Sequence, residues 1–565
     1  MTKKKKFRIK KFGLLFLLIV IGITSLFLVP KILKKTLVIV KKDMYLASDA
    51  LTIKLYDVET FKEVKEQVRG TKIVLYDKDI KKEEEEGKDP IIYKKIQLDK
   101  KFYLVKPTNL VKLLNETVME KTGFVRTNLT TYKTSTEIDI DSYLTKGTKI
   151  DITGFDSLNK DGSVRMYKIK DGDHESFLYS KYIVFSQEEA NKHYDEAGLY
   201  QIHAARTDTL GGGSGDNLDY YPNPKPNFPK NKFLADAKTL YLNCGVLNNV
   251  DAYIELAKNT GINSFVVDVK ENTVPAYPSA VMEKYSSTSF NKAANTKENF
   301  GNAIKKLKDA GFYVIGRITT FKDSYYITDH PEDAITSTSS GKPFLHNGSY
   351  WPSPFVRTVW EYNTKLAVEA VKEFGFNEIQ FDYMRFPDRS YTIEVNGLVD
   401  MKNKFKETKA QALQTFMMYA TDEIHNAGAY VSVDVFGESS NTYITAYGQY
   451  WPAISNVVDA ISAMPYPDHF DAGQYGLATP WTKPYILFSK WALEASNRQK
   501  EIPTPAVART WIQAYNAIKP PYNTYGPEEI KAQITGLKDG GLTGGFITWN
   551  SSSNIEKYKS ISTGW

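Results

Sequence analysis

The chain has 565 residues, several times the length of a usual domain, and its single cysteine, Cys244, excludes a disulfide scaffold and a cysteine-based zinc site. Twelve of its 73 basic residues precede the first acidic residue, Asp43, so the remaining 61 basic and 66 acidic residues carry a net charge of −5. A basic charge confined to residues 1–42 favours a membrane contact there and disfavours a nucleic-acid partner elsewhere.

Residues 13–29 form an uncharged, almost wholly apolar run between Lys11 and Lys31. This run is at the short end of what crosses the ~30 Å hydrocarbon layer of a membrane. A cleaved signal peptide is the alternative, but no small-x-small cleavage site precedes Pro30. Seven positive charges precede the run and five follow it closely. We therefore expect residues 1–42 to form a cytoplasmic tail and an uncleaved single-pass anchor in the cell membrane, with the C-terminal part extracytoplasmic.

Two stretches further along the chain repeat each other. The matching segments are GTKIVLYD at 70–77 with GTKIDITG at 147–154, and YKKI at 93–96 with YKIK at 167–170. We interpret residues 43–118 and 123–187 as two copies of one small all-β, barrel-like module. The second copy, ending in FLYSKYIV, resembles bacterial Src-homology-3-like modules, which often bind cell-wall peptide or glycan. A role as a spacer is the alternative.

Residues 188–237 contain a glycine run at 211–215 and a proline-rich stretch at 221–229. Glycine makes a joint flexible and repeated proline makes it extended, so we predict a Gly/Pro-rich linker here. A phosphate-binding loop is excluded because no strand precedes the glycines and no helix comes after them. We expect the two modules to be separable from the C-terminal part of the chain.

From residue 238 to residue 565, apolar strands alternate with amphipathic helices. The predicted strands are 239–245, 263–269, 313–319, 378–382, 430–436, 460–464, 506–511 and 545–549. Near-continuous apolar strands indicate a parallel sheet that is buried on both faces. Eight strand–helix units predict an α/β fold of the (β/α)₈ TIM-barrel type, with an open doubly wound sheet as the alternative.

Side-chain alternation along these strands predicts which residues point into the barrel. Gln380 and Asp382 share one face of their strand, Asp268 and Lys270 share a face of theirs, and Arg317 points inward from the third strand. The other predicted inward residues are Ser432, Asp434, Arg509, Trp511 and Trp549. Polar groups at the C-terminal ends of barrel strands are where barrel enzymes hold their active sites.

Among the residues predicted to point into the barrel or to lie at its rim, carboxylates are the groups best suited to catalysis. The seven histidines show no HxH or HExxH spacing, and no GxSxG motif is present, so we expect no metal and no cofactor. The remaining candidates are Asp268, Asp382, Asp434 and Glu438. Two carboxylates that flank a bond are what glycoside hydrolysis requires. Aromatic residues in the loop 320–363 suit the faces of sugar rings.

Each candidate also has a structural interpretation. An inward aspartate can be the ion-pair partner of a buried cation such as Arg317, Arg385 or Lys270. Glu438 can lie on a loop surface, and His469 can serve as a hydrogen-bonding partner. The tryptophans of the long loop can pack the loop against the barrel.

Six motifs resemble, in order, those of a family of glycoside-hydrolase TIM barrels from bacterial surface proteins, which is distantly similar to the α-amylase superfamily. They are VVDVKE at 266–271, QFDYMRFP at 380–387, DVFG at 434–437, SAMPYPDHF at 462–470, RTWIQ at 509–513 and GFITWN at 545–550. Thr510 stands where proline is common in the family, and Asp468 where serine is common. These departures put the choice of substrate in doubt rather than the class of enzyme.

The resemblance implies that Asp382 is the nucleophile, with Asp434 or Glu438 as the general acid. The substrate-binding residues that we predict are Asp268, Lys270, Arg317, Tyr383, Arg385, Tyr466, His469, Arg509, Gln513 and Trp549.

The predicted function is a membrane-anchored glycoside hydrolase whose partner is a cell-wall, capsule or other extracellular polysaccharide. A non-catalytic carbohydrate-binding surface protein is the main alternative, and a structural spacer of the cell surface is a third. A barrel fold does not decide between them.

Overall fold

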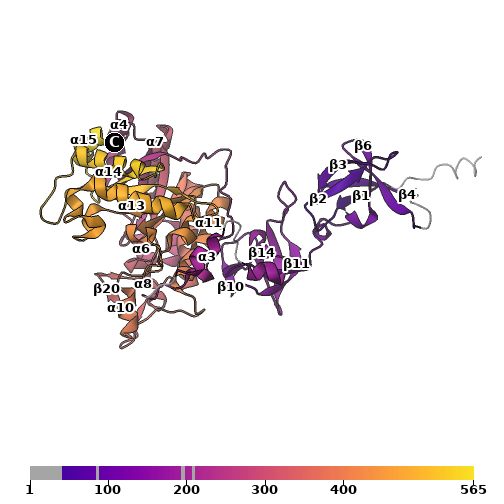
Figure 1. Ribbon diagram of the computed structural model, residues 1–565, viewed down its shortest axis with the longest axis horizontal. Helices are drawn as coiled ribbons and strands as arrows, with labels where there is room; N and C mark the ends of the chain where they lie inside the picture. Colours follow the sequence, from indigo (N-terminus) through magenta and orange to yellow (C-terminus); the bar gives the residue numbers. More distant parts are fainter. Residues whose placement is uncertain (1–40, 84–87, 193–197, 207–209) are drawn as a thin grey trace, which may run out of the picture. The chain divides into compact units, whose positions relative to one another are not determined.

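The computed structural model describes residues 41–83, 88–192, 198–206 and 210–565 (Figure 1). The chain divides into two compact units, Met1–Lys121 with Ile152–Lys168 and Thr122–Asp151 with Ile169–Trp565. The membrane anchor predicted at residues 13–29 lies outside the described residues. None of the described helices is both long enough and apolar enough to cross a membrane.

Two seven-stranded sheets follow each other along the chain and have the same strand order. The first sheet runs β3-β2-β6-β5-β4-β1-β7 and the second β10-β9-β13-β12-β11-β8-β14, so corresponding strands occupy corresponding places. This identity of topology agrees with the sequence repeat. The likeness to Src-homology-3 modules stays a prediction.

The strands of the first sheet are β1 Lys41–Leu46, β2 Thr52–Tyr56, β3 Glu63–Val68, β4 Lys72–Lys82, β5 Ile91–Leu98, β6 Lys101–Val105 and β7 Leu110–Val111. Those of the second are β8 Thr122–Val125, β9 Leu129–Tyr132, β10 Ile140–Leu144, β11 Lys149–Phe155, β12 Met166–Asp171, β13 His174–Tyr179 and β14 Ile183–Val184. Alternation explains their cores: in β2, Thr52 and Lys54 are exposed, whereas Ile53 and Leu55 are buried.

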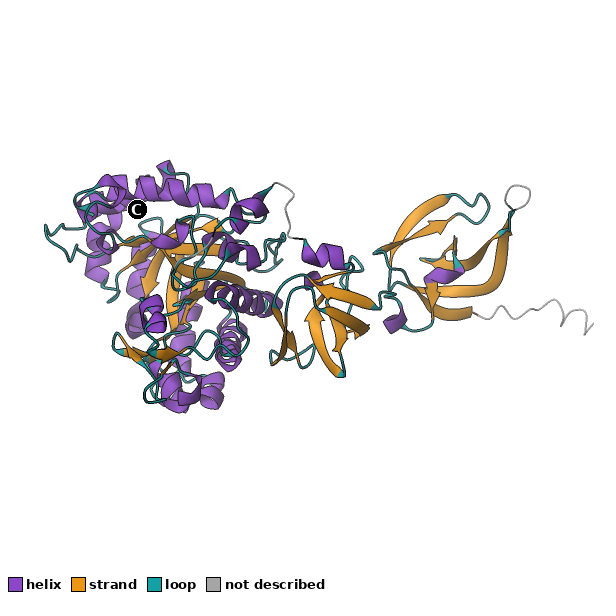
Figure 2. Cartoon of the chain, turned by 60° about the horizontal axis from the view of Figure 1, so that its bottom comes forward, coloured by secondary structure: helices purple, strands orange, loops and turns teal. Residues whose placement is uncertain are grey.

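Nine parallel strands form a nearly closed ring in the C-terminal part, which gives the TIM-like barrel that the sequence predicts (Figure 2). They are β15 Ala237–Leu242, β16 Ser264–Glu271, β18 Tyr313–Thr319, β22 Glu378–Asp382, β24 Tyr430–Phe436, β25 Ala460–Met464, β26 Val507–Ala508, β27 Thr510–Gln513 and β28 Gly545–Trp549. The strands β26 and β27 are one strand interrupted at Arg509. The first pairs with β25 and the second with β28, which brings the two ends of the sheet together.

Helices surround this ring (Figure 2). They are α4 Val250–Lys258, α5 Ala280–Tyr285, α6 Ser287–Asn291, α7 Lys297–Asp309, α8 Ser324–Asp329, α9 Arg357–Phe374, α10 Ser390–Val395, α11 Lys409–Asn426, α12 Trp451–Ser455, α13 Pro484–Gln499, α14 Pro527–Asp539 and α15 Ile555–Ile561. Helix α7 shows why they form: Phe300, Ala303, Ile304 and Leu307 make one buried stripe, and the Thr296 side chain caps the first turn.

Short pairings decorate the barrel. They are β17 Val274–Pro275 beside β16, β19 Thr336–Ser337 with β23 Val399–Asp400, and β20 Leu345–His346 with β21 Ser349–Tyr350. Two further helices, α2 Gln187–Asn191 and α3 Leu199–Ala204, precede the barrel.

The described part of 188–237 differs from the flexible joint that its glycines and prolines predict. His203 is fully buried, stacks on Tyr220 at 4.0 Å between ring centroids, and hydrogen-bonds the Tyr450 hydroxyl of the barrel at 2.8 Å. The Asn231 side chain donates to the Asn377 carbonyl at 2.9 Å. The described residues of this segment therefore pack onto the barrel at both His203 and Asn231.

The second β-module also contacts the barrel, through the part of it that belongs to the larger unit. The hydroxyls of Tyr179 and Tyr182 donate to Glu423 and Asp422 of α11 at 2.8 and 2.9 Å. From α11, the Tyr419 hydroxyl donates to the Ile138 carbonyl at 2.6 Å. Polar groups buried in this way are satisfied only while the two parts stay together, so this portion is not the separable module that we expected.

Candidate active site

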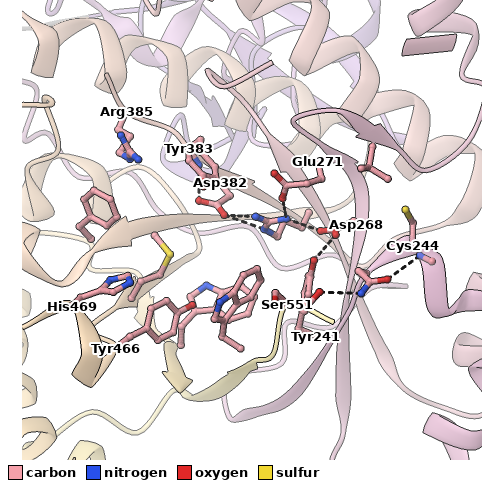
Figure 3. Close-up of a pocket in the computed structure, with 18 of the residues that line it drawn as sticks. Tyr241, Cys244, Asp268, Glu271, Asp382, Tyr383, Arg385, Tyr466, His469 and Ser551 are labelled. Atoms are coloured by element: carbon pink, nitrogen blue, oxygen red, sulfur yellow. Dashed lines mark hydrogen bonds and ion pairs between the residues drawn. The ribbon is translucent and has the colours of Figure 1, made fainter. Parts of the chain in front are cut away.

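A cavity of about 840 Å³ opens where the barrel strands end (Figure 3). Its wall contains residues from the C-terminal ends of β15, β16, β18, β22, β24, β25, β27 and β28. They are Tyr241, Asp268, Glu271, Arg317, Asp382, Phe436, Met464, Trp511 and Trp549. The size and position are those of a small-molecule or oligosaccharide site in a TIM barrel.

Arg317 is the central cation of this cavity and is 1% exposed. Its Nη1 lies 2.7 Å from Asp268 Oδ1 and 2.7 Å from Glu271 Oε2, and its Nη2 lies 2.5 Å from Asp382 Oδ2. The register of the strands explains the cluster. Asp268 of β16 lies directly opposite Arg317 of β18. On the other side of β18, Ile318 lies opposite Phe381 of β22, and Asp382 is the next residue of β22. Three carboxylates thus share one guanidinium.

Asp382 ends β22 and points into the cavity (Figure 3). Arg317 holds one of its oxygens, and the other accepts a hydrogen bond from the Tyr383 backbone N–H at 2.5 Å. Tyr383 has φ = 48°, a left-handed conformation that is uncommon for a non-glycine residue and often marks a functional site. The cation beside Asp382 is Arg317 rather than Arg385, whose Nη1 lies 3.8 Å from Asp388.

Asp268 and Glu271 lie on the same strand, but their surroundings push their pKa values apart. Burial raises the pKa of Asp268 to about 6, an effect that the charge of Arg317 partly offsets. The Tyr241 hydroxyl donates to Asp268 Oδ2 at 2.5 Å. For Glu271, burial also favours the neutral form, but the charge and hydrogen bond of Arg317 outweigh it and lower the pKa. Two carboxyls with separated pKa values are what acid–base catalysis uses.

Asp434, one of the two residues predicted to be the general acid, does not line this cavity. It is 1% exposed, its Oδ1 accepts from Trp511 Nε1 at 2.7 Å, and its Oδ2 lies 3.9 Å from Arg317 Nε. Burial first, and then the charge of Asp382, hold the pKa of Asp434 well above its usual range. The structure therefore places Asp434 inside the barrel, close to Asp382 but outside the wall of the cavity.

Glu438 lies on the 3₁₀ turn Gly437–Ser440 and lines a second, adjoining cavity. Its carboxylate accepts hydrogen bonds from the hydroxyls of Tyr443 and Tyr447 at 3.0 and 2.6 Å. Asp382 is not part of that cavity's wall. The two candidates for the general acid are thus both separated from the space beside Asp382, one by burial and one by position.

The other predicted substrate-binding residues divide into two groups. Those that line the first cavity are Asp268, Arg317, Tyr383, Arg385, Tyr466, His469 and Trp549. Burial first, and then Lys519, lower the pKa of His469, which favours its neutral form. The remaining three, Lys270, Arg509 and Gln513, have structural partners elsewhere.

Lys270 departs from the predicted alternation because the strand is irregular after Asp268. The irregularity turns Lys270 outward, where it pairs with Asp323 at 2.5 Å and lies 4.9 Å from the ring of Tyr362 on α9. Arg509 pairs with Glu378 at 2.8 Å, at the opposite end of β22 from Asp382. Gln513 donates to Asp468 at 2.9 Å.

Sequence reasoning missed several residues of the cavity. Glu271 was visible as a carboxylate at the C-terminal end of a strand, and Tyr241 as an inward residue of the first strand. The aromatic residues of the loop 320–363 were predicted to offer faces to a sugar, with packing of the loop as the alternative. Trp351 and Trp360 are 2% and 0% exposed, so these two tryptophans pack the loop against the barrel. The aromatic wall comes from the barrel strands instead.

Substitution of Arg317 by methionine should destabilise the protein by about 3–5 kcal/mol at about pH 7, because Asp268 and Asp382 would stay buried, and Glu271 half-buried, without their cation. Their folded-state pKa values would then exceed the unfolded ones, so the loss should shrink as the pH falls to about 5 and the carboxylates protonate. Urea unfolding at the two pH values measures this. The control is Arg389→Met at an exposed site. An equal loss at both pH values would contradict the assignment.

Residues 239–555 match the family described as "Putative glycosyl hydrolase domain". No curated protein matches the chain. Among solved structures, it is similar to a hypothetical protein from Ruminiclostridium thermocellum, with 29% identity over 35% of this chain and 97% of that one and a TM-score of 0.29.

A second similar structure is the PgaB (BpsB) glycoside hydrolase domain from Bordetella bronchiseptica, with 13% identity over 58% of this chain and 99% of that one and a TM-score of 0.42. A third is the spore cortex-lytic enzyme SleL of Bacillus megaterium, with 12% identity over 60% of this chain and 76% of that one and a TM-score of 0.36. Since the family match spans more than half of the 565 residues, the chain belongs to the family of the "Putative glycosyl hydrolase domain".

Proposed function

We propose that this protein is a glycoside hydrolase that cleaves a cell-wall, capsule or other extracellular polysaccharide with two carboxyl groups. One observation supports this most: Asp382 and Asp268 line one cavity, contact the same guanidinium, and differ in what surrounds them. Glycoside hydrolysis needs one carboxylate that attacks the sugar or activates water and one carboxylic acid that protonates the leaving oxygen.

Asp382 is suited to the first role. The Nη2 of Arg317 lies 2.5 Å from its carboxylate, and the Tyr383 N–H fixes the orientation of that carboxylate. Asp268 is suited to the second role, because burial raises its pKa to about 6 and it therefore carries a proton in slightly acidic solution. In this proposal Asp268 replaces Asp434 and Glu438 as the general acid.

Aromatic rings supply the surface for a sugar. Trp549 lies with its ring 4.7 Å from that of Tyr241 and 6.5 Å from that of Tyr466, the latter pair nearly parallel at 24°. Both tyrosines and Trp549 line the cavity that holds Asp382. Flat apolar faces of this kind stack on the apolar faces of pyranose rings.

Substitution of Asp382 by asparagine should lower the hydrolytic rate by at least about 10³-fold, because an amide neither attacks the sugar nor activates water. The rate is measured on whichever polysaccharide of a wall and capsule panel the parent cleaves, and circular dichroism checks folding. The matched control is Asp251→Asn on the exposed side of α4, which should keep the parent rate.

Retained hydrolysis in Asp382→Asn would refute the nucleophile or base assignment. Binding of a glycan by the parent, with no cleavage of any glycan on the panel, would favour the non-catalytic carbohydrate-binding alternative.

The pH dependence should identify the acid. If Asp268 donates the proton, the rate falls as the pH rises through about 6, because the protonated fraction of Asp268 falls there. Asp268→Asn should remove this decrease of the rate above about pH 6. It should also slow cleavage by about 10²–10⁴-fold on ordinary glycosides, but far less on glycosyl fluorides, whose leaving group needs no proton. Asp388→Asn, in the same cavity, should keep the decrease of the rate above about pH 6. Loss of this decrease in Asp388→Asn alone would overturn the assignment.

We further propose that residues 13–29 anchor the enzyme in the cell membrane with the barrel outside, on the basis of the apolar run and its flanking lysines. Protease added to intact, wall-stripped cells should digest the barrel, whereas an epitope at the N-terminus should be cut only after permeabilisation. Full protection of the barrel, or a mature N-terminus after residue 25, would contradict this topology.

A further inference from the structure

A second cavity of about 860 Å³ adjoins the first one. Phe436, Met464 and His469 line both cavities, so the two are neighbouring spaces along one surface of the barrel. Figure 3 shows His469 at one side of the first cavity, on the far side of Asp382 from Cys244. A polymer that occupies the first cavity has its next unit in reach of the second.

The second cavity combines carboxylates with aromatic rings. Its own residues include Glu438, Glu494 of α13, Tyr443, Phe470 and Tyr475. Tyr475 is held in the left-handed region, with φ = 52°, and its ring packs against Phe470 at 5.6 Å between centroids. Several ring faces therefore surround two acidic groups.

Neither carboxylate has a cationic partner among the residues that the structure describes. Glu438 accepts from Tyr443 at 3.0 Å and from Tyr447 at 2.6 Å, and Glu494 accepts from Tyr475 at 2.7 Å. Tyrosine hydroxyls orient these groups but leave their charges uncompensated. The three carboxylates around Arg317 in the first cavity are in the opposite situation.

Both negative charges act on one ring. Burial first, and then the charge of Glu438 and its hydrogen bond, raise the pKa of Tyr443, and Glu494 raises it further. Two basic side chains lie nearby without pairing with these carboxylates: Lys490 donates to the Tyr475 carbonyl at 2.8 Å, and Arg385 lies 4.5 Å from the Phe436 ring. The lowered pKa of His469 favours its uncharged form. Among the described residues, Glu438 and Glu494 are therefore left without an ion-pair partner.

We propose that the second cavity is a subsite for a sugar unit that carries a free ammonium group, that is, an amino sugar without its acetyl group. This inference rests on the proposed function, because the unit belongs to the polysaccharide whose neighbouring bond lies beside Asp382. An ammonium has three donors for the free lone pairs of Glu438 and Glu494, and the tyrosine faces suit both a pyranose ring and a cation. An N-acetyl group in its place has no charge for these carboxylates to bind.

The test measures binding by the full chain carrying Asp382→Asn, so that bound glycan is not cleaved. The probes are the hexasaccharides of glucosamine, N-acetylglucosamine and glucose at about pH 6. Glucosamine hexasaccharide should bind about three- to tenfold tighter than the acetylated one, as expected for two partly exposed charge pairs, and salt should reduce the difference.

Glu438→Gln and Glu494→Gln should each reduce this preference by about two- to fivefold. The matched control is Glu528→Gln, at an exposed position of α14, which should keep it. Equal affinity for the acetylated and free amino sugars, an unchanged preference in both cavity variants, or equally tight binding of trilysine would overturn the subsite.

The two proposals fail separately. Cleavage of a glycan by the parent with no preference for the amino sugar overturns the subsite and leaves the hydrolase. A preference that depends on Glu438 and Glu494, together with no cleavage of any glycan, supports the subsite and overturns the hydrolase.

Discussion

The buried guanidinium of Arg317 is the interaction on which the candidate site depends. Arg317, Asp268 and Asp382 cannot be buried separately, because each isolated ion would cost several kcal/mol to remove from water, and the half-buried Glu271 adds a third contact to the same cation. Their contacts at 2.5–2.7 Å make burial of the group possible and tie β16, β18 and β22 together at their C-terminal ends. The same contacts give Asp382 and Asp268 their different environments. Stability and chemistry therefore rest on one side chain.

Alternation along strands predicted much of this cluster. Asp268, Arg317 and Asp382 all point inward as expected, because their strands are regular up to those positions. The prediction is wrong for Lys270, since the strand becomes irregular after Asp268 and the side chain turns outward. Alternation also does not predict how deep in the barrel a side chain lies. Asp434 points inward but is buried against Trp511, below the open cavity. Alternation predicts on which face of a strand a side chain lies, whereas its depth in the barrel depends on all the side chains that fill the interior.

Composition was a weaker guide than periodicity. The glycine and proline runs of 188–237 predicted a flexible joint, yet His203 is buried and Asn223 donates to the Val457 carbonyl at 2.9 Å. An extended proline-rich chain has free backbone and side-chain polar groups, and these can bond to a neighbouring surface. The partners of His203 and Asn223 are more than 200 residues away in the sequence, so the local composition does not predict these contacts. In contrast, each strand and helix of the eightfold alternation is recognisable from its own short stretch of sequence, and this alternation predicted the barrel.

The two cavities show how the same residue type can serve different purposes. Asp382 contacts the guanidinium of Arg317 directly, so its charge is compensated and it is suited to act on a bond rather than to hold a second cation. Glu438 and Glu494 have only tyrosine hydroxyls as partners, so their charge is available to a ligand. Because the cavities share Phe436, Met464 and His469, a ligand that spans both would meet the two environments at once. The placement of a single arginine thus separates the space suited to bond cleavage from the space suited to recognition.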